Sequence, residues 1–284
     1  MALGLHPSQS FLELMEMRDR GFKLAVAGKG GVGKTFISGT LARLLARDGY
    51  RVLAVDADPN INLASTLGVS REVSERIIPL SENDRLIAEK TGVPPGGSYG
   101  LVFRLTPRVD DIFQRFCVEA PDGVRLLVMG TVKGGDTGCM CPANALLRVL
   151  MQHLLLSRGE VVVMDMVAGL EHLGRGTAKR VDSMLVVVEP TLKSIETLRR
   201  IVKLAREIEI PEVLAVANKV RDERSRKLIE RELGDTPVAA YIPYDPSIEE
   251  AELLGVAPLD HDENSPAIEA VRGLKDYLKD RYGF

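Results

Sequence analysis

The stretch VAGKGGVGKT, residues 26–35, decides how this sequence folds. It follows a short apolar run, and apolar side chains recur after it at spacings of three and four, which is typical of a helix. Gly28 and Gly33 stand five positions apart, and a lysine and a threonine follow at once. This spacing matches the phosphate-binding loop, or P-loop, that joins a strand to a helix. The sequence therefore predicts a nucleotide site at the start of the first long helix.

The residue types in this loop suit phosphate binding. Glycines let backbone N–H groups converge on phosphate oxygens, and the N-terminus of the helix adds the positive end of its dipole. We expect Lys34 to reach the β and γ phosphates and Thr35 to give its hydroxyl to Mg²⁺. The residues expected to surround the phosphates through their backbone are Gly28, Lys29, Gly30, Gly31, Val32 and Gly33.

Short apolar runs rich in β-branched residues alternate along the chain with longer segments of helical periodicity. The runs are KLAVA (23–27), RVLAV (51–55), RLLVM (125–129), VVVMD (161–165), MLVVV (184–188), VLAVA (213–217) and VAAYI (238–242). Continuous apolar runs suit strands that are covered on both faces. The pattern predicts an α/β protein with a doubly wound, mainly parallel seven-stranded sheet flanked by helices, the fold of P-loop NTPases.

The same alternation suggests how the chain is divided into domains. We expect a single P-loop ATPase domain over residues 23–284, with residues 1–22 as an N-terminal appendage. The stretch from about 69 to 123 breaks the alternation and contains PPGGSYG (94–100), so it is predicted to be an insertion of irregular structure and short helices.

Composition restricts the class of partner. The chain has 284 residues, is 45% apolar and carries a formal net charge of −3, which disfavours bulk attraction to nucleic acid or anionic lipid. It has no apolar window of about 18 residues and no leader pattern, so we expect a cytoplasmic protein with no nucleic-acid or membrane partner. Three cysteines in a reducing compartment are not a disulfide framework.

Acidic residues follow two of the predicted strands. Asp56 and Asp58, in VDADPN, come at the carboxyl end of the second strand, where ligands bind in such folds. Asp165 ends the run VVVMD, an arrangement that suits holding Mg²⁺ through water. The glycines Gly169, Gly174 and Gly176 after it would let this segment move with the state of the nucleotide. A turn or helix-cap role is the alternative for Asp56 and Asp58.

The extra lysine of GKGGVGKT, Lys29, directly follows the first glycine and makes the loop similar to the deviant P-loop of the MinD, ParA, ArsA and nitrogenase iron protein class of ATPases. The resemblance implies that Lys29 reaches across a dimer interface to the partner's nucleotide, as an arginine finger does. It also implies that Asp58 orients or deprotonates the attacking water and that Asp56 supports the Mg²⁺ shell. A solvated loop lysine is the alternative for Lys29.

Recognition of adenine is implied by the same resemblance. Asn218 and Lys219, in VANKVRD, come at the end of another predicted strand, and the class uses this asparagine to hydrogen-bond the base. The residues that resemble the second wall of the base pocket are Pro243, Tyr244 and Asp245, in IPYDPS. ATP rather than GTP is expected on this ground.

The pair Cys139 and Cys141 lies in GGDTGCMCPAN, residues 134–144. Two thiolates at this spacing chelate one ion but fall short of a four-coordinate site, and the same pair from a second subunit would complete it. Sulfur donors suit tetrahedral Zn²⁺ or square-planar Ni²⁺. A redox disulfide, an iron–sulfur cluster and a chance pair of buried cysteines remain alternatives. Cys117 is assigned to the core.

Six segments together resemble the CooC type of ATPase, the maturation factor that inserts nickel into carbon monoxide dehydrogenase. They are AGKGGVGKT, MGTVKGGDTGCMCPAN, VVMDMVAGLEHLGRGTAK, VVVEPTLKSIET, VANKVRD and IPYDPSI. The resemblance implies that ATP closes a homodimer and that the paired cysteine loops meet at its interface to bind Ni²⁺ or Zn²⁺. It further implies that slow, dimer-dependent hydrolysis to ADP and phosphate opens the dimer during delivery of nickel to carbon monoxide dehydrogenase.

Two other functions remain open. A maturation factor for another nickel enzyme, such as acetyl-CoA synthase, would share these motifs. A MinD/ParA-like positioning ATPase would need a basic amphipathic tail or patch. The C-terminal segment, residues 265–284, instead mixes lysine and arginine with aspartate and glutamate, so we expect a docked terminal helix there.

Overall fold

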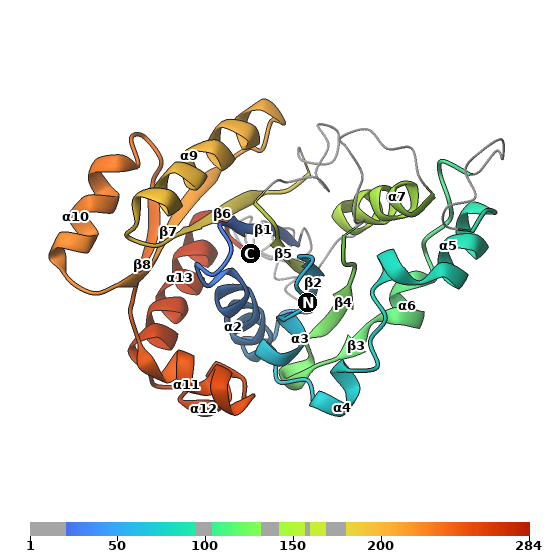
Figure 1. The fold of residues 1–284 in the computed structure, drawn as a ribbon, viewed down its shortest axis with the longest axis horizontal. Helices are drawn as coiled ribbons and strands as arrows, with labels where there is room; N and C mark the ends of the chain where they lie inside the picture. Colours follow the sequence, from blue (N-terminus) through green and yellow to red (C-terminus); the bar gives the residue numbers. More distant parts are fainter. Residues whose placement is uncertain (1–20, 95–103, 132–141, 157–159, 169–179) are drawn as a thin grey trace, which may run out of the picture.

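A computed structural model describes residues 21–94, 104–131, 142–156, 160–168 and 180–284. Its centre is one sheet with the strand order β3-β4-β2-β5-β1-β6-β7-β8, and helices lie on both sides of it (Figure 1). The strands are β1 (Phe22–Gly28), β2 (Val52–Ala57), β3 (Val118–Glu119), β4 (Arg125–Val128), β5 (Val161–Met166), β6 (Ser183–Val188), β7 (Val213–Val220) and β8 (Val238–Pro243).

The seven apolar runs of the sequence form seven parallel strands, as predicted. The sheet has an eighth strand, β3, which pairs antiparallel with β4 at the edge. The predicted count of seven missed it because a strand of two residues, one of them exposed, leaves no apolar run in the sequence. The doubly wound, mainly parallel architecture is otherwise confirmed.

The helices vary from single turns to four or five turns. They are α2 (Lys34–Arg47), α3 (Leu63–Thr66), α4 (Arg71–Ser74), α5 (Asp84–Thr91), α6 (Ile112–Phe116), α7 (Pro142–Leu156), α9 (Leu192–Glu207), α10 (Glu223–Glu232), α11 (Pro246–Leu254), α12 (Pro258–His261) and α13 (Pro266–Tyr282), with 3₁₀ turns η1 (Leu80–Glu82) and η2 (Pro121–Gly123). None of the helices in the described part of the chain combines the length and apolar character that a membrane span requires.

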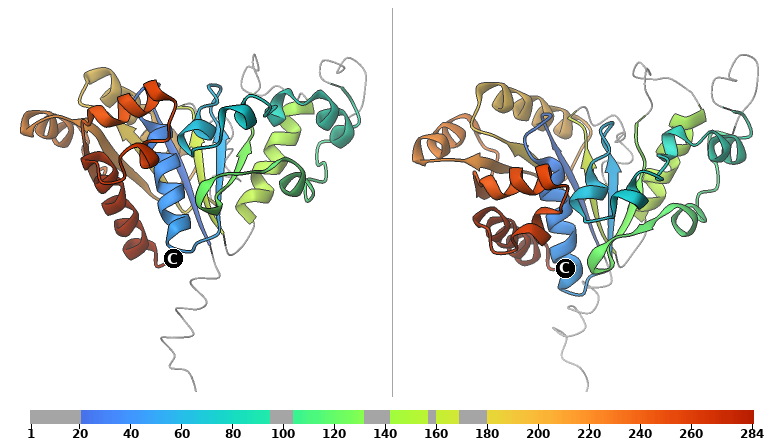
Figure 2. Two further views of the ribbon diagram at one scale, coloured as in Figure 1. Left: turned by 90° about the horizontal axis from the view of Figure 1, so that it is seen from below. Right: turned by 60° about the horizontal axis from the view of Figure 1, so that its bottom comes forward.

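The two faces of the sheet bury separate cores. One face packs against α5, α6, α7, α9 and α10, and the other against α2, α3, α12 and α13 (Figures 1 and 2). Neighbouring residues of one strand, such as Leu126 and Leu127 of β4, therefore enter opposite cores. Because side chains alternate along a strand, both positions must be apolar, which explains the continuous runs in the sequence.

The register of the sheet brings four strand ends to one edge. Val26 of β1 and Asp56 of β2 are both paired with Asp165 of the strand between them, β5. On the other side of β1, Gly28 is paired with Val187 of β6. Strands β2, β4 and β5 lie on one side of β1, and β6, β7 and β8 lie on the other. Ligands of such folds bind at this switch point, beyond the carboxyl ends of the strands.

The segment predicted as an insertion contains mostly short elements. From α4 to η2, the described residues form single helical turns, the eight-residue helix α5, the five-residue helix α6 and the edge strand β3. Its apolar residues, such as Leu86 and Ile112, join the core beneath α7. The described residues begin at 21, so residues 1–20 of the predicted appendage lie outside them.

Candidate nucleotide-binding site

The phosphate loop occupies the turn between β1 and α2, at the sheet edge described above. Gly33 precedes the first residue of α2 with a φ of 96°, in the left-handed region that favours glycine. A Cβ atom at Gly28 would lie 2.6 Å from the carbonyl oxygen of Val187. These two glycines are therefore required by backbone conformation and by close packing, independently of any ligand.

Two side-chain pairs, one ionic and one hydrogen-bonded, involve the first residues of α2. The Nζ atom of Lys34 is 3.4 Å from the Oδ2 atom of Asp58, and both side chains are buried. The hydroxyl of Thr35 donates a hydrogen bond of 2.6 Å to the Oδ2 atom of Asp165. The structure thus brings together residues from three separate segments, as the strand-end argument predicted.

Asp165 is a buried carboxylate with unused hydrogen-bonding capacity. Its Oδ1 atom is buried and has no hydrogen-bond partner among the described residues. The pKa of Asp165 is raised to about 6, chiefly by burial and also by the charge of Asp58, against the lowering effects of Thr35 and Lys34. A buried acceptor of this kind favours a cation or its bound water nearby.

Asp56 uses both carboxylate oxygens within its own chain segment. Its Oδ1 atom accepts a hydrogen bond from the backbone N–H of Asp58 at 3.2 Å, and its Oδ2 atom accepts one from that of Leu63 at 3.0 Å. Burial and the charge of Asp165 raise the pKa of Asp56 to about 7, although the two backbone hydrogen bonds oppose this shift. The carboxylate of Asp56 therefore fixes the loop that carries Asp58.

The end of β7 contacts the phosphate loop directly. The Nδ2 atom of Asn218 donates to the carbonyl oxygen of Val32 at 2.7 Å, and the Nζ atom of Lys219 donates to that of Gly31 at 2.9 Å. Asn218 is buried, and Lys219 has a φ of 57°. The two residues lie at the end of a strand, as the sequence predicted, and their amide and ammonium groups bond the backbone of the P-loop.

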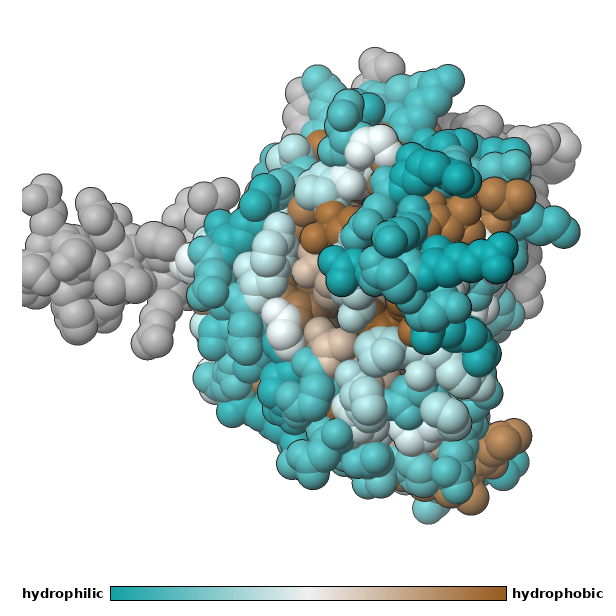
Figure 3. Space-filling model, turned by 90° about the vertical axis from the view of Figure 1, so that its left-hand side faces the viewer, coloured by the Kyte–Doolittle hydropathy of each residue, from teal (hydrophilic) through white to brown (hydrophobic). Residues whose placement is uncertain are grey.

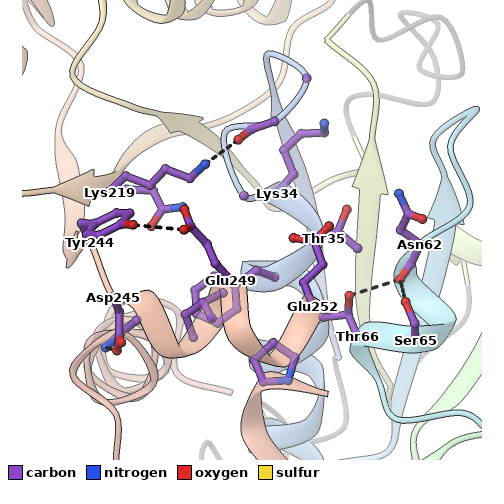
Figure 4. A pocket seen from close by; sticks show the side chains of 18 of the residues that line it. Lys34, Thr35, Asn62, Ser65, Thr66, Lys219, Tyr244, Asp245, Glu249 and Glu252 are labelled. Atoms are coloured by element: carbon purple, nitrogen blue, oxygen red, sulfur yellow. Dashed lines mark hydrogen bonds between the residues drawn. The ribbon is translucent and has the colours of Figure 1, made fainter. Parts of the chain in front are cut away.

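A pocket of about 410 Å³ opens beside the loop (Figure 4). Eleven of the residues predicted from the sequence line it: Gly30, Gly31, Gly33, Lys34, Thr35, Asp58, Asn218, Lys219, Pro243, Tyr244 and Asp245. Asp56 and Asp165 lie behind this lining and are almost completely buried.

Other lining residues were not predicted. The polar ones are Asn60, Asn62, Ser65, Thr66, Glu249 and Glu252. The first four follow Asp58 within eight positions. Their place just after the end of a strand could therefore have identified them as site residues from the sequence. Glu249 and Glu252 come from α11, and Figure 4 shows them below Lys219 and Tyr244. Their spacing of three puts them on one helix face, but that pattern alone does not reveal which cavity the face borders.

The wall formed by Tyr244 and Asp245 is held by several contacts. The guanidinium of Arg221 lies 3.5 Å from the ring centroid of Tyr244, and the Tyr244 hydroxyl donates to Glu249 at 3.0 Å. The Asp245 carboxylate accepts from the backbone N–H of Ser247 at the start of α11 and from that of Ala267 in α13. Asp245 therefore joins two helices beside the pocket.

Some predicted site residues either do not line the described pocket or lie outside the described residues. Lys29 is half-buried in the loop but does not line the described pocket. Cys139 and Cys141 lie outside the described residues, as do the three glycines after Asp165. Among the residues that the structure does describe, no group of three or more histidine, cysteine, aspartate or glutamate side chains has the arrangement of a metal site. Cys117 packs against the core, and burial raises its pKa to about 11, as expected for a core thiol.

The family is established by sequence similarity. A family model described as the CobQ/CobB/MinD/ParA nucleotide binding domain matches residues 23–266. The chain therefore belongs to the CobQ/CobB/MinD/ParA family of nucleotide-binding proteins. Within this family it is an ATPase of the CooC type, as its similarity to individual proteins indicates.

Two relatives match along most of their length. An uncharacterized ATP-binding protein of Methanocaldococcus jannaschii is 44% identical over 259 residues, which cover 90% of this chain and 97% of that protein. The carbon monoxide dehydrogenase accessory protein CooC of Rhodospirillum rubrum is 43% identical over 238 residues, which cover 84% of this chain and 89% of that protein.

Solved structures agree on the fold. The MinD protein of the MinC:MinD complex from Aquifex aeolicus matches with a TM-score of 0.64 at 20% identity, covering 91% of this chain and 96% of that one. MinD with Mg-ADP from Pyrococcus horikoshii matches with a TM-score of 0.63 at 20% identity, covering 92% and 98%. At 20% identity this similarity supports the fold but not a shared function.

Proposed function

We propose that this chain is a dimerising ATPase that binds Ni²⁺ or Zn²⁺ through Cys139 and Cys141 and assists the insertion of nickel into carbon monoxide dehydrogenase. The observation that carries the proposal is the 43% identity, over 84% of the chain, to a carbon monoxide dehydrogenase accessory protein. Within this proposal, hydrolysis of ATP is a slow conformational switch, and the nickel ion is cargo.

The described site fits Mg²⁺ with ATP. The hydroxyl of Thr35 would ligate the ion directly, and the unpartnered Oδ1 atom of Asp165 is available to a water in its coordination shell. When bound, Mg²⁺ neutralises charge on the β and γ phosphates. Lys34, on the first turn of α2, adds a fixed positive charge at the same phosphates.

Asp58 is the group that we assign to the attacking water. Its Oδ1 atom accepts the backbone N–H of Asn60 at 2.9 Å, and its Oδ2 atom lies 3.4 Å from Lys34, so the carboxylate is held at the pocket wall. From there it would orient the water or accept its proton. Lys29 would act on the partner subunit's nucleotide, which agrees with its absence from the lining of its own described pocket.

Exposed apolar side chains beside the pocket support a nucleotide-dependent dimer. Val256 lines the pocket and is 41% exposed, and its neighbours Leu253 and Leu254 are 88% and 62% exposed. Figure 3 shows hydrophobic residues protruding at the lower right, where α11 and α12 lie. Ile61, on the loop after Asp58, is 38% exposed. Adjacent apolar groups of this size favour an interface over a solvated surface.

The cysteine pair would be shared across that interface. The segment containing it starts after Gly130, whose N–H, with that of Met129, bonds the backbone carbonyl of Asp56. Its other end is the start of α7. Four thiolates from two chains would complete one coordination sphere, tetrahedral for Zn²⁺ or square-planar for Ni²⁺.

A metal titration tests the site. The full chain is titrated with Ni²⁺, and separately with Zn²⁺, with and without Mg²⁺ and a nonhydrolysable ATP analogue. We expect one ion per two chains, bound more tightly with the analogue, lost in the Cys139→Ala/Cys141→Ala double variant and kept in Cys117→Ala. Stoichiometric metal in the double variant would refute the cysteine site, and sedimentation as a monomer with the analogue would refute the dimer.

A reconstitution assay tests the client. Nickel-free carbon monoxide dehydrogenase is incubated with the chain, Ni²⁺ and ATP, and its activity is compared with that after Ni²⁺ alone. We expect activation that Asp58→Asn reduces. Activation of nickel-free acetyl-CoA synthase in its place would reassign the client while leaving the metal site intact.

A further inference from the structure

Two residues at the end of β7 donate hydrogen bonds to two consecutive peptide units of the phosphate loop. Lys219 holds the carbonyl oxygen of Gly31, a contact visible in Figure 4, and Asn218 holds that of Val32. A trans peptide points its N–H opposite to its C=O. Anchoring the carbonyls of Gly31 and Val32 therefore fixes the directions of the next two N–H groups, those of Val32 and Gly33, away from β7.

These two N–H groups are the kind that a phosphate requires. Gly31 and Gly33 line the pocket, and the Val32 N–H makes only a long contact of 3.4 Å with the carbonyl of Lys29. A hydrogen bond to a charged phosphate oxygen is stronger than such a contact. An ammonium group on the Gly31 carbonyl also polarises that peptide unit and strengthens its N–H as a donor.

The backbone around the contact is shaped for it. A Cβ atom at Gly33 would lie 2.2 Å from the Nδ2 atom of Asn218, so the amide fills space that only glycine leaves. The pairing of β7 with β8 shifts register between Ala217 and Val220, and Lys219 within this irregularity has a left-handed φ of 57°. A non-glycine residue in this conformation is sparsely populated and marks a position where geometry serves the site.

We propose that Asn218 and Lys219 are positioning residues of the phosphate loop, which act on phosphate binding through the carbonyls of Val32 and Gly31. Their effect then falls on the triphosphate whatever base it carries. This inference rests on the proposed nucleotide site and differs from the sequence-based prediction that Asn218 bonds adenine. The Nδ2 group of Asn218 donates to the Val32 carbonyl, which leaves its Oδ1 atom for any contact with a base.

The experiment compares ligands with and without a base. Mg²⁺ complexes of ATP, GTP and inorganic tripolyphosphate compete with a fluorescent ADP analogue on the wild type, Asn218→Ala, Lys219→Ala and Lys219→Arg. The matched control is Lys227→Ala, an α10 lysine whose side chain is 71% exposed and pairs with Glu223. Thermal unfolding of the nucleotide-free variants verifies folding, and Lys219→Ala, whose hydrogen bond is exposed, covers the case in which Asn218→Ala does not fold.

We expect both alanine variants to bind ATP and tripolyphosphate about tenfold more weakly, by a common factor. Lys219→Arg keeps a cationic donor and should recover most of the affinity, and Lys227→Ala should match the wild type. A loss confined to ATP would overturn the inference in favour of a base contact, and unchanged affinities would overturn it outright. Failure of the wild type to bind ATP would instead refute the proposed nucleotide site.

Discussion

Asp56 and Asp165 are paired in direct register on the adjacent parallel strands β2 and β5, and their exposed fractions are 0% and 1%. Two acidic groups so placed repel each other when both are charged, and burial adds to the cost. The pKa of Asp56 is raised to about 7 and that of Asp165 to about 6. The register of the sheet thus places two carboxylates that repel each other when charged, and a bound cation would reduce this repulsion.

This repulsion predicts that the stability of the nucleotide-free protein depends on pH. Between the ordinary pKa of 3.8 and the raised value of about 7, folded Asp56 keeps a proton that the unfolded chain has released. The free energy of unfolding therefore falls as the pH rises through this window. Asp56→Asn should flatten the fall. Urea unfolding in the presence of EDTA at pH 5 and pH 8 measures this change in unfolding free energy. The control is Asp235→Asn, because Asp235 is exposed. An equal change between the two pH values in the wild type and both variants would contradict the raised pKa of Asp56.

The contact between Thr35 and Asp165 predicts a change in Mg²⁺ dependence. Asp165 orients the Thr35 hydroxyl at 2.6 Å, and loss of such a supporting partner costs about 10–100-fold in metal affinity or activity. Asp165→Asn should raise the Mg²⁺ concentration for half-maximal ATP hydrolysis by that order. Thr35→Ser keeps a hydroxyl and should be milder than Thr35→Ala. Identical Mg²⁺ titrations of Asp165→Asn and the wild type would exclude this role.

The buried contacts of Arg43 predict that its removal lowers the stability of the fold, although Arg43 does not line the nucleotide pocket. It is 2% exposed, forms two hydrogen bonds with Asp260 at 2.6 and 2.8 Å, and bonds Asp122 at 2.6 Å, so it ties α2 to α12 and η2. Arg43→Ala removes the arginine that pairs with Asp260 and leaves Asp122 with Arg47 alone, so it should cost about 2–4 kcal/mol of unfolding free energy, measured by urea denaturation.

Arg71 provides the matched control for Arg43. Its side chain is 91% exposed, and it pairs at 2.7 Å with Glu75, the residue that follows α4. Arg71→Ala should leave the unfolding free energy close to that of the wild type, because exposed ion pairs contribute little to stability. Equal losses of unfolding free energy in Arg43→Ala and Arg71→Ala would show that the buried cluster around Arg43 contributes no more to stability than an exposed ion pair.

The sequence predicted the parts of the fold that depend on local pattern. Strands covered on both faces need continuous apolar runs, so the seven parallel strands could be found, whereas the two-residue strand β3 could not. The same logic found the strand-end residues of the site, since the carboxyl ends of parallel strands meet at one edge. Asp58, Asp165 and Asn218 are examples.

What the sequence could not predict depends on tertiary packing. Glu249 and Glu252 line the pocket from α11, whose N-cap residue Asp245 bonds the backbone of Ala267 in α13, and no local pattern encodes that tertiary contact. The direction of the Asn218 amide is a similar case. A strand end gives its position, but only the packed structure shows that its Nδ2 group bonds the phosphate loop.

The last prediction concerns whether Lys29 acts on its own subunit or on a partner. Lys29→Ala and Asp58→Asn should each reduce ATP hydrolysis by about 10²-fold or more, since each removes a group assigned to the transferring phosphoryl or the attacking water. If Lys29 acts across a dimer, a mixed dimer contains one complete site. The Lys29→Ala chain supplies Asp58, and the Asp58→Asn chain supplies Lys29.

An equimolar mixture of the two inactive variants therefore tests the shared site. With random exchange of subunits, half of the dimers are mixed and one of their two sites is complete, so turnover should recover to about a quarter of the wild-type value. The control is the double variant Lys29→Ala/Asp58→Asn mixed with either single variant, in which every site lacks one or both groups if Lys29 acts in trans. A mixture that stays as inactive as its components would place Lys29 in its own subunit's site and remove the need for a dimer in catalysis.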